Sequence, residues 1–299
     1  MATSWLKVRY LDDSPPWKSE LTSDRGYIAI SCKKFVPGSF ICSEYPTVTV
    51  SGWHPFTESQ VEEINNKVNA LPDSDKQAFF EMANAFPENS SVAAGIFMTN
   101  AFDMVDSPLG KESGMYCALA RLNHSCIPNA QQTHIPSTSE EVLYASRCIE
   151  IGDEINDCYI DLRQSREHRR KELLNLYRFK CECLACEQEG ELLKCDDRNR
   201  TRAKQLDDNI LLAAENDPYQ ALDIAHQLLN LLEKDDCRGW SERYIADCHL
   251  SIYLLAESIG DHQKMRRHID LCHQLNIKLQ GPTSPDSLKS FQLMRDCPG

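Results

Sequence analysis

Three cysteines fall within six residues, at Cys181, Cys183 and Cys186. Thiolates suit a soft divalent ion such as zinc, which in structural sites takes four sulfur or nitrogen ligands at the corners of a tetrahedron. Only three ligands are local, so a closed site needs a fourth from elsewhere, and Cys126 and Cys195 are the candidates. The alternative is that these thiols are reduced and bind no metal.

A polar segment that contains a proline runs from Arg121 to Asn129, as Arg-Leu-Asn-His-Ser-Cys-Ile-Pro-Asn. Short polar side chains compete with the backbone for hydrogen bonds and proline lacks a donor, so this segment predicts a loop. Polar loops on rigid scaffolds often carry function. Asn123 and His124 are therefore candidates for chemistry, although residue types alone allow them equally to satisfy buried backbone groups.

A third group of residues lies further along the chain. The segment 152–161 reads Gly-Asp-Glu-Ile-Asn-Asp-Cys-Tyr-Ile-Asp and contains Tyr159, and Tyr177 and Phe179 follow it. By pattern alone these residues predict a turn, a short strand and aromatic core side chains, because tyrosines in strands usually pack against neighbours.

In this order, the three segments resemble the SET domain of the SET-and-MYND family of protein lysine methyltransferases and of its fungal SET-domain relatives. Shorter matches are Phe-Val-Pro-Gly at 35–38, Glu-Tyr-Pro at 44–46 and Thr-Asn-Ala-Phe at 99–102. The resemblance covers about residues 20 to 186. It implies an enzyme that transfers a methyl group from S-adenosylmethionine to a lysine of a histone or non-histone protein.

The resemblance also assigns roles to individual residues. It implies that Tyr159 is the active-site tyrosine and that Tyr177 lines the lysine channel beside it. It implies that Cys126 is the fourth ligand of one structural zinc ion, with Cys181, Cys183 and Cys186. The implied cofactor-binding residues are Arg25 and Gly26 in an early turn, Asn100, Asn123, His124 and Phe179, whose ring would stack on the adenine.

Two departures from the family pattern are visible in the sequence. The glycine-rich turn near the start of the domain keeps only Gly26, with Asp24 where a second glycine is common. No Cys/His cluster with finger spacing lies between Cys42 and Cys117, so the MYND finger has no counterpart there. The altered turn leaves a second hypothesis open, a catalytically silent SET-like module that binds a peptide or serves as a scaffold.

The charge balance restricts the partners. The chain has 45 acidic and 32 basic side chains, a formal net charge of -13. Nucleic-acid binding needs an excess of Lys and Arg to displace phosphate counterions, so we expect no direct nucleic-acid partner. A protein or peptide substrate with a lysine is compatible with this charge.

The expected location is intracellular, in the nucleus or the cytoplasm. No stretch approaches the roughly 18 apolar residues that span a bilayer, and residues 1–16 lack the apolar core of a signal peptide. We therefore expect no membrane contact and a monomer. In such a compartment the 14 cysteines stay reduced, which favours metal binding over disulfides.

Patterning and the resemblance together predict an α+β fold. It consists of a SET domain of short β-sheets with an inserted helical region, a zinc-bound post-SET segment and an all-helical, tetratricopeptide-like C-terminal domain. The expected domains are residues 1–165, with the inserted helices at about 55–110, then 166–195 and 196–299. Because the tail begins so soon after Cys186, we expect it to form one wall of the substrate cleft.

Individual strands and helices are predicted from the periodicity of apolar residues and from capping residues, prolines and glycines at their ends. Strands are predicted at 27–30 and 39–42, joined as a hairpin through Pro37-Gly38, and at 142–149. Helices are predicted from a capping box at 57–60 to about 71, from 73 or 74 to before Pro87, from 92 to about 104, and at 165–177. In the tail, helices are predicted at about 199–215, 218–234, 240–259, 262–279 and 286–295.

Overall fold

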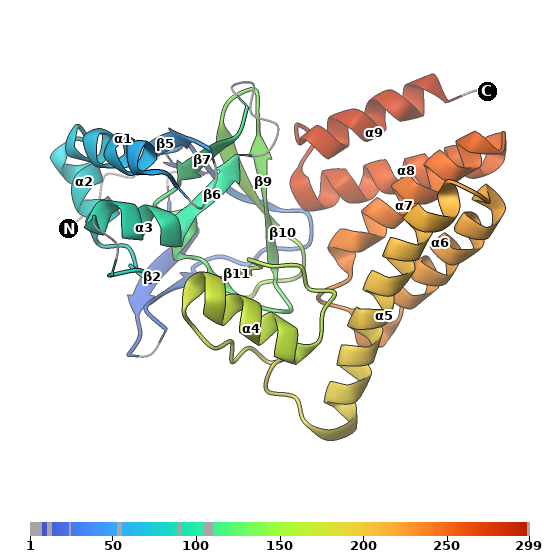
Figure 1. Ribbon diagram of the computed structural model, residues 1–299, viewed down its shortest axis with the longest axis horizontal. Coiled ribbons are helices and arrows are strands. Elements are labelled where there is room, and N and C mark those ends of the chain that lie inside the picture. Colours follow the sequence, from blue (N-terminus) through green and yellow to red (C-terminus); the bar gives the residue numbers. More distant parts are fainter. Residues whose placement is uncertain are drawn as a thin grey trace.

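The computed structural model describes residues 8–10, 14–23, 25–52, 56–88, 91–104 and 110–297, and structural statements refer to these residues. Short strands and helices alternate in the N-terminal part, and a stack of helices forms the C-terminal part (Figure 1). The expected combination of short sheets with a helical tail is confirmed. Asp24, which takes the place of a family glycine, lies outside the described residues.

The strands form small sheets, and almost all of their pairs are antiparallel. The largest sheet has the order β1-β4-β10-β9, beside the β2–β3 pair and the sheet β5-β7-β6. The exception is the parallel pairing of β8 with β11, which joins two polar motifs distant in sequence. The strands are Val8–Arg9 (β1), Trp17–Leu21 (β2), Tyr27–Ser31 (β3), Phe40–Glu44 (β4), Val48–Ser51 (β5), Ala101–Met104 (β6), Glu112–Met115 (β7), Asn123–His124 (β8), Ala130–Ile135 (β9), Glu140–Ala145 (β10) and Asn156–Asp157 (β11).

The predicted hairpin between residues 27–30 and 39–42 is wrong. Both strands exist, but β3 pairs with β2, whereas β4 lies between β1 and β10. Gly38 makes the expected turn with a φ of 90°, and its N–H donates to the carbonyl of Ala145 at 2.7 Å. The turn therefore directs the chain to β10. Turn residues predict where a chain reverses, but they do not identify the partner strand.

The inserted region contains the three predicted helices, two of which are shorter than expected, since the helix predicted to run to before Pro87 ends at Phe80. They are α1 (Glu58–Asn69), α2 (Asp73–Phe80) and α3 (Val92–Asn100). The capping box of α1 is confirmed, with Thr57 and Gln60 bonded reciprocally. The helix expected from 92 to about 104 ends at Asn100, because Ala101 adopts an extended conformation and the next residues pair with β7 as β6.

The helix predicted at 165–177 is confirmed as α4 (Arg166–Tyr177), with Ser165 as its N-cap. It ends at Arg178, which has a left-handed φ of 60°. A non-glycine residue in this region reverses the chain direction sharply. The reversal brings Phe179 and the three clustered cysteines back toward the SET strands.

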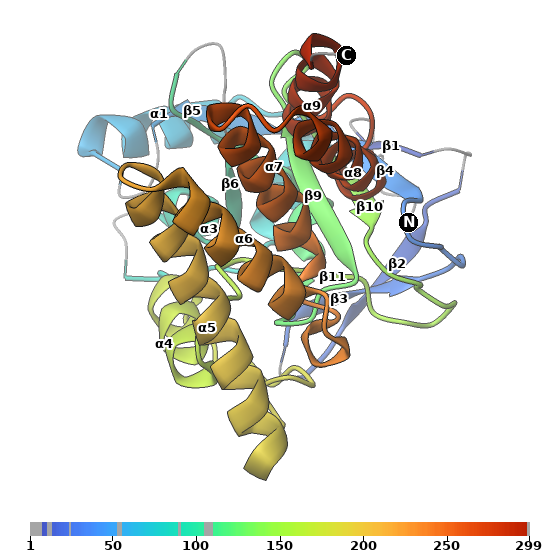
Figure 2. The same ribbon diagram turned by 90° about the vertical axis from the view of Figure 1, so that its right-hand side faces the viewer.

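The tail consists of helices that pack in chain order, α5 on α6, α6 on α7, α7 on α8 and α8 on α9 (Figures 1 and 2). Asp217, Asp261 and Ser284 cap α6, α8 and α9, as the punctuation predicted. The first helix begins at Gly190, well before the expected start near 199. The helices are α5 (Gly190–Ala214), α6 (Pro218–Leu232), α7 (Glu242–Ser258), α8 (His262–Gln280) and α9 (Pro285–Asp296).

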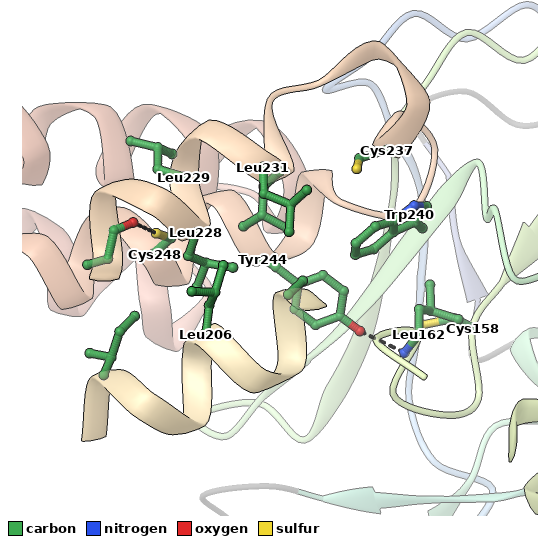
Figure 3. Close-up of a cluster of buried hydrophobic side chains, with 14 of the residues drawn as sticks. Cys158, Leu162, Leu206, Leu228, Leu229, Leu231, Cys237, Trp240, Tyr244 and Cys248 are labelled. Carbon is green, nitrogen blue, oxygen red and sulfur yellow. Dashed lines mark hydrogen bonds between the residues drawn. The ribbon is translucent and has the colours of Figure 1, made fainter. Parts of the chain in front are cut away.

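The tail shares one hydrophobic core with the end of the SET region. Leu162 packs in the same buried cluster as Leu206 of α5, Leu228 of α6 and Tyr244 of α7 (Figure 3). The hydroxyl of Tyr244 accepts a hydrogen bond from the backbone N–H of Leu162 at 2.8 Å and donates one to Asp161 at 2.8 Å. The position of the tail is therefore fixed against the segment that follows Tyr159.

None of the described helices is long and apolar enough to cross a membrane.

The Tyr244 contact predicts a stability change. Tyr244→Phe removes the acceptor of a buried backbone N–H, so we expect the free energy of unfolding to fall by about 1–3 kcal/mol in urea titrations. The matched control is Tyr219→Phe, which alters a tyrosine that is 65% exposed. A loss no larger than that of the control would contradict this account.

Candidate functional site

The parallel pairing of β8 and β11 brings the loop motif beside the second polar motif. Asn123 is in register with Asn156, and His124 with Asp157. The N–H of Ser125 donates to the carbonyl of Asp157 at 2.8 Å, which extends the pairing by one residue. The segment that the sequence predicts as a loop is therefore a two-residue strand followed by a turn, and it places His124 next to the residues before Tyr159.

Four rings form an aromatic cluster around Tyr159. Its ring centroid lies 5.0 Å from that of Tyr177, 5.4 Å from that of His124 and 6.4 Å from that of Phe179. The backbone N–H of Tyr159 donates to Nδ1 of His124 at 3.0 Å, and its hydroxyl donates to the carbonyl of Leu122. The structure thus brings His124 of the loop motif together with Tyr159, Tyr177 and Phe179 of the third group.

Burial determines the protonation of this cluster. It raises the pKa of Tyr159, with smaller contributions from Asp157 and Tyr177. It also raises the pKa of Tyr177 to about 12, while it lowers the pKa of His124 to about 4. At neutral pH both hydroxyls therefore keep their protons and the imidazole is uncharged. Neither hydroxyl is therefore ionised to act as a base, and that of Tyr159 is a hydrogen-bond donor.

A cavity of about 860 Å³ opens on one side of this cluster. Tyr159, Tyr177 and Asn100 line it from the SET region. Arg243 of α7 and Asp286 of α9 line it from the tail. The tail therefore forms part of the cavity wall, as its position in the sequence led us to expect.

The other predicted cofactor residues do not line this cavity. Asn123 donates through Nδ2 to the carbonyl of Tyr27 at 3.1 Å and to Glu154 at 3.3 Å. Arg25 donates to the second carboxylate oxygen of Glu154 at 2.9 Å. Gly26, next to Arg25, has a φ of 68°, a conformation that favours glycine. Glu154 thus links the early turn at Arg25 and Gly26 to β8 (Asn123–His124), the loop strand.

Glu154 is a residue for which the sequence suggested no role. It lies in the Gly-Asp-Glu-Ile motif, but that pattern indicates only a turn and a strand. A lone carboxylate becomes informative only when its partners, here Arg25 and Asn123, are known to converge on it. Asn100, by contrast, is held by its own region, since its Nδ2 donates to the carbonyls of Ala83 and Ile96 at 2.7 Å.

Four cysteine sulfurs lie close together where α4 ends. The Sγ atoms of Cys126, Cys181, Cys183 and Cys186 are all within 4.8 Å of one another. Tetrahedral zinc with Zn–S bonds of about 2.3 Å separates its sulfur ligands by about 3.8 Å, so this spacing fits a metal ion. Cys195, the other candidate, lies instead beside Asp236, 3.8 Å from its Oδ2 atom. The four cysteines could therefore hold a metal ion, with Cys126 as the distant ligand.

Comparison with known families identifies the strand-rich part of the chain. The family model described as "SET domain" matches residues 26–160. Residues 26–160, a little under half of the chain, are therefore similar to SET domains. The match extends from the turn at Gly26 through the loop strand to Tyr159, so it contains half of the predicted site residues. Tyr177, Phe179 and three of the four cysteines follow it.

Several lysine methyltransferases are similar in sequence. Histone-lysine N-methyltransferase set5 of Schizosaccharomyces pombe is 30% identical over 185 residues, 62% of this chain and 54% of that protein. Human histone-lysine N-methyltransferase SMYD3 is 37% identical over 78 residues, 26% of this chain and 18% of that protein. N-lysine methyltransferase SMYD2 of Rattus norvegicus is 33% identical over 135 residues, 43% of this chain and 31% of that protein. The chain thus spans about half the length of the set5 protein and less of the others.

A solved structure, the SET domain of LSMT bound to lysine and AdoHcy, matches with a TM-score of 0.41 and 12% identity, covering 96% of this chain and 86% of that chain. This similarity is too low to add to the family match. The resemblance inferred from the motifs is confirmed by the SET domain and by the set5 and SMYD relatives.

The Glu154 contacts predict a local change in dynamics. Glu154→Ala removes the acceptor shared by Arg25 and Asn123, so we expect faster amide hydrogen exchange in residues 25–28 than in the wild type. Glu150→Ala is the matched control, because Glu150 makes an exposed ion pair with Lys34. Equal exchange in the two variants would show that Glu154 does not anchor the turn.

Proposed function

We propose that this protein is an S-adenosylmethionine-dependent protein-lysine N-methyltransferase, acting on a lysine of a histone or non-histone protein. The observation that carries the proposal is the position of Tyr159. Its ring lines the cavity and also contacts His124 and Phe179, which lie away from the cavity. Tyr159 thus lies between the cavity and the side that carries His124 and Phe179. A residue in this position suits a reaction between two molecules, one bound on each side.

In this proposal the protein substrate occupies the cavity and the cofactor lies on the other side of Tyr159. Tyr177 would line the lysine channel beside Tyr159. The cofactor would be held by the residues that the family resemblance indicates: Arg25, Gly26, Asn123, His124 and Phe179 on that side, and Asn100 from the cavity wall. Support comes from the convergence of Arg25 and Asn123 on Glu154 and from the packing of Phe179 near His124.

In this reaction the main task of the protein is to position the methyl group and the lysine amine. S-adenosylmethionine, when bound, would supply an electrophilic methyl group for the lysine nitrogen. An amine with a reference pKa of about 10.4 must lose its proton first, and a channel walled by Tyr159 and Tyr177 favours the uncharged form. The Tyr159 hydroxyl is already oriented by the carbonyl of Leu122, so its oxygen can hold the methyl group and the amine in line.

We also propose that the metal ion is zinc and that its role is structural. Four sulfur ligands close a tetrahedral site and leave no position for water or substrate. The ion would hold the segment after α4 against the loop strand. Zinc would therefore set the distance between Phe179 and His124, which each lie two residues from a ligand.

The second hypothesis, a SET-like module without methyl transfer, rests on Asp24 in the early turn. It would bind a peptide in the same cavity and use the tail as a scaffold. The assembled Tyr159 cluster favours the enzyme over this module. The two hypotheses differ in whether the protein turns over S-adenosylmethionine.

The test of the enzyme is methyl transfer by the purified chain to core histones and to a cell-protein extract, followed by mass spectrometry of lysines. We expect Tyr159→Phe to lower kcat by roughly 100-fold or more with little change in KM, because only a hydroxyl aimed at the reacting atoms is lost. Tyr45→Phe, at an exposed tyrosine, is the control. An unchanged kcat would remove Tyr159 from the mechanism, and a wild type without turnover would favour the silent module.

A further inference from the structure

Arginines surround the cysteine cluster on two sides. On α4, Arg170 donates to the carbonyl of Cys181 at 2.9 Å and to that of Cys186 at 3.1 Å. Arg166, one helical turn earlier, donates to the carbonyl of Cys186 at 3.1 Å as well. These two side chains hold the backbone of two ligands against the helix. Their spacing puts them on one face of α4 together with Arg169.

Two further arginines are completely buried beside Cys126. Arg169 has no exposed surface, and its Nε donates to the Sγ of Cys126 at 3.3 Å. Arg200, from α5 of the tail, is buried to the same extent and donates to the carbonyl of Cys126 at 3.0 Å. It also donates to the carbonyl of Leu162 at 3.0 Å and stacks over the ring of Trp240 at 4.7 Å.

The two acids around these guanidiniums are not equally buried. Asp196 is the buried acid that both arginines face, at 2.8 Å from Arg200 and 3.5 Å from Arg169. Asp197, 3.8 Å from Arg169, is partly exposed and contributes less. Arginine stays protonated, and burying an unpaired charge is strongly destabilising. Four neutral thiols would supply no compensating charge.

A divalent ion with four thiolates changes this balance. Four negative sulfurs and one doubly charged cation leave two net negative charges at the cluster. They lie directly beside Arg169, whose Nε is 3.3 Å from the Sγ of Cys126, and add to the negative charge of Asp196 and Asp197. A hydrogen bond from a guanidinium N–H to a metal-bound thiolate is also stronger than one to a neutral thiol.

We propose that Arg169 and Arg200, supported by Arg166 and Arg170, form a cationic cage whose charge is offset most fully by the metal-loaded thiolates. The cage thereby raises metal affinity and couples it to the docking of the tail. The inference rests on the metal site proposed above. Arg169 and Arg200 are positioning residues, since they contact the ligand Cys126 and not a substrate. Because Arg200 belongs to the tail, loss of the ion should loosen the contact between α5 and the SET region.

The cage is tested by measuring zinc affinity, by competition with a coloured chelator, in Arg169→Met and Arg200→Met. We expect each variant to bind zinc roughly 10- to 100-fold more weakly, the range for residues that support metal ligands. Arg163→Met is the matched control, because this partly buried arginine pairs with Asp161 and Asp207 and not with a cysteine. Arg169→Lys should retain part of the affinity, since it keeps the charge.

The melting temperature gives a readout that a purely structural role would not produce. In the zinc-loaded form, Arg169→Met should lower Tm, because it removes a charge that the thiolates need. In the metal-free form it should raise Tm, because it removes a buried charge that has too few partners. Asp196→Asn should have the opposite effect and lower the Tm of the metal-free form below that of the wild type, because it removes the acid that both arginines face.

The outcomes separate the cage from the metal site. A wild type that contains no metal when purified without chelators would overturn both proposals. Zinc bound with equal affinity by wild type and Met variants would overturn only the cage, as would an equal fall of Tm in the loaded and metal-free forms. If the Met variants do not fold, Arg169→Lys and Asp196→Asn provide the same comparison.

Discussion

The sulfur of Cys126 lies among the sulfurs of a segment that is distant in sequence, so it connects two parts of the chain. One part is the loop strand, which carries Asn123 and His124. The other is the segment after α4, which carries Phe179 and the remaining three cysteines. Closing the four-sulfur cluster therefore decides how Phe179 and Tyr177 meet Tyr159. The proposed metal site would thereby hold the aromatic cluster together at one end of the cavity.

The same closure determines how the tail is held. Arg200 crosses from α5 to the carbonyl of Cys126, and Tyr244 from α7 bonds to Leu162, so two tail helices attach within a few residues of the aromatic cluster. Once these helices are fixed, α8 contacts β9 and β10, and the turn to α9 brings Asp286 to the cavity (Figure 2). The tail is thus part of the site's architecture and not an appendage of the SET domain.

Helix caps and helix ends that depend on neighbouring residues were predictable from the sequence. The partners of the strands were not. The caps at Thr57 and Ser165 and the stops between tail helices depend on neighbouring residues, so those helices were found. The partner of β4, the end of α3 and the early start of α5 depend on distant contacts. The motifs gave the site residues their proposed roles, whereas Glu154 and the arginine cage emerge only from convergence in space. Domain boundaries and residue roles remain predictions.

The central claim is that the metal-loaded cysteine cluster assembles the methyl-transfer site. Calorimetric titration of S-adenosylmethionine into the zinc-loaded protein and into the chelator-treated protein, at a temperature where both remain folded, tests it most directly. The account predicts binding of one cofactor per chain with zinc present and a binding constant at least roughly 10-fold weaker after zinc removal. Equal binding by the two forms, or no binding by the zinc-loaded protein, would contradict it.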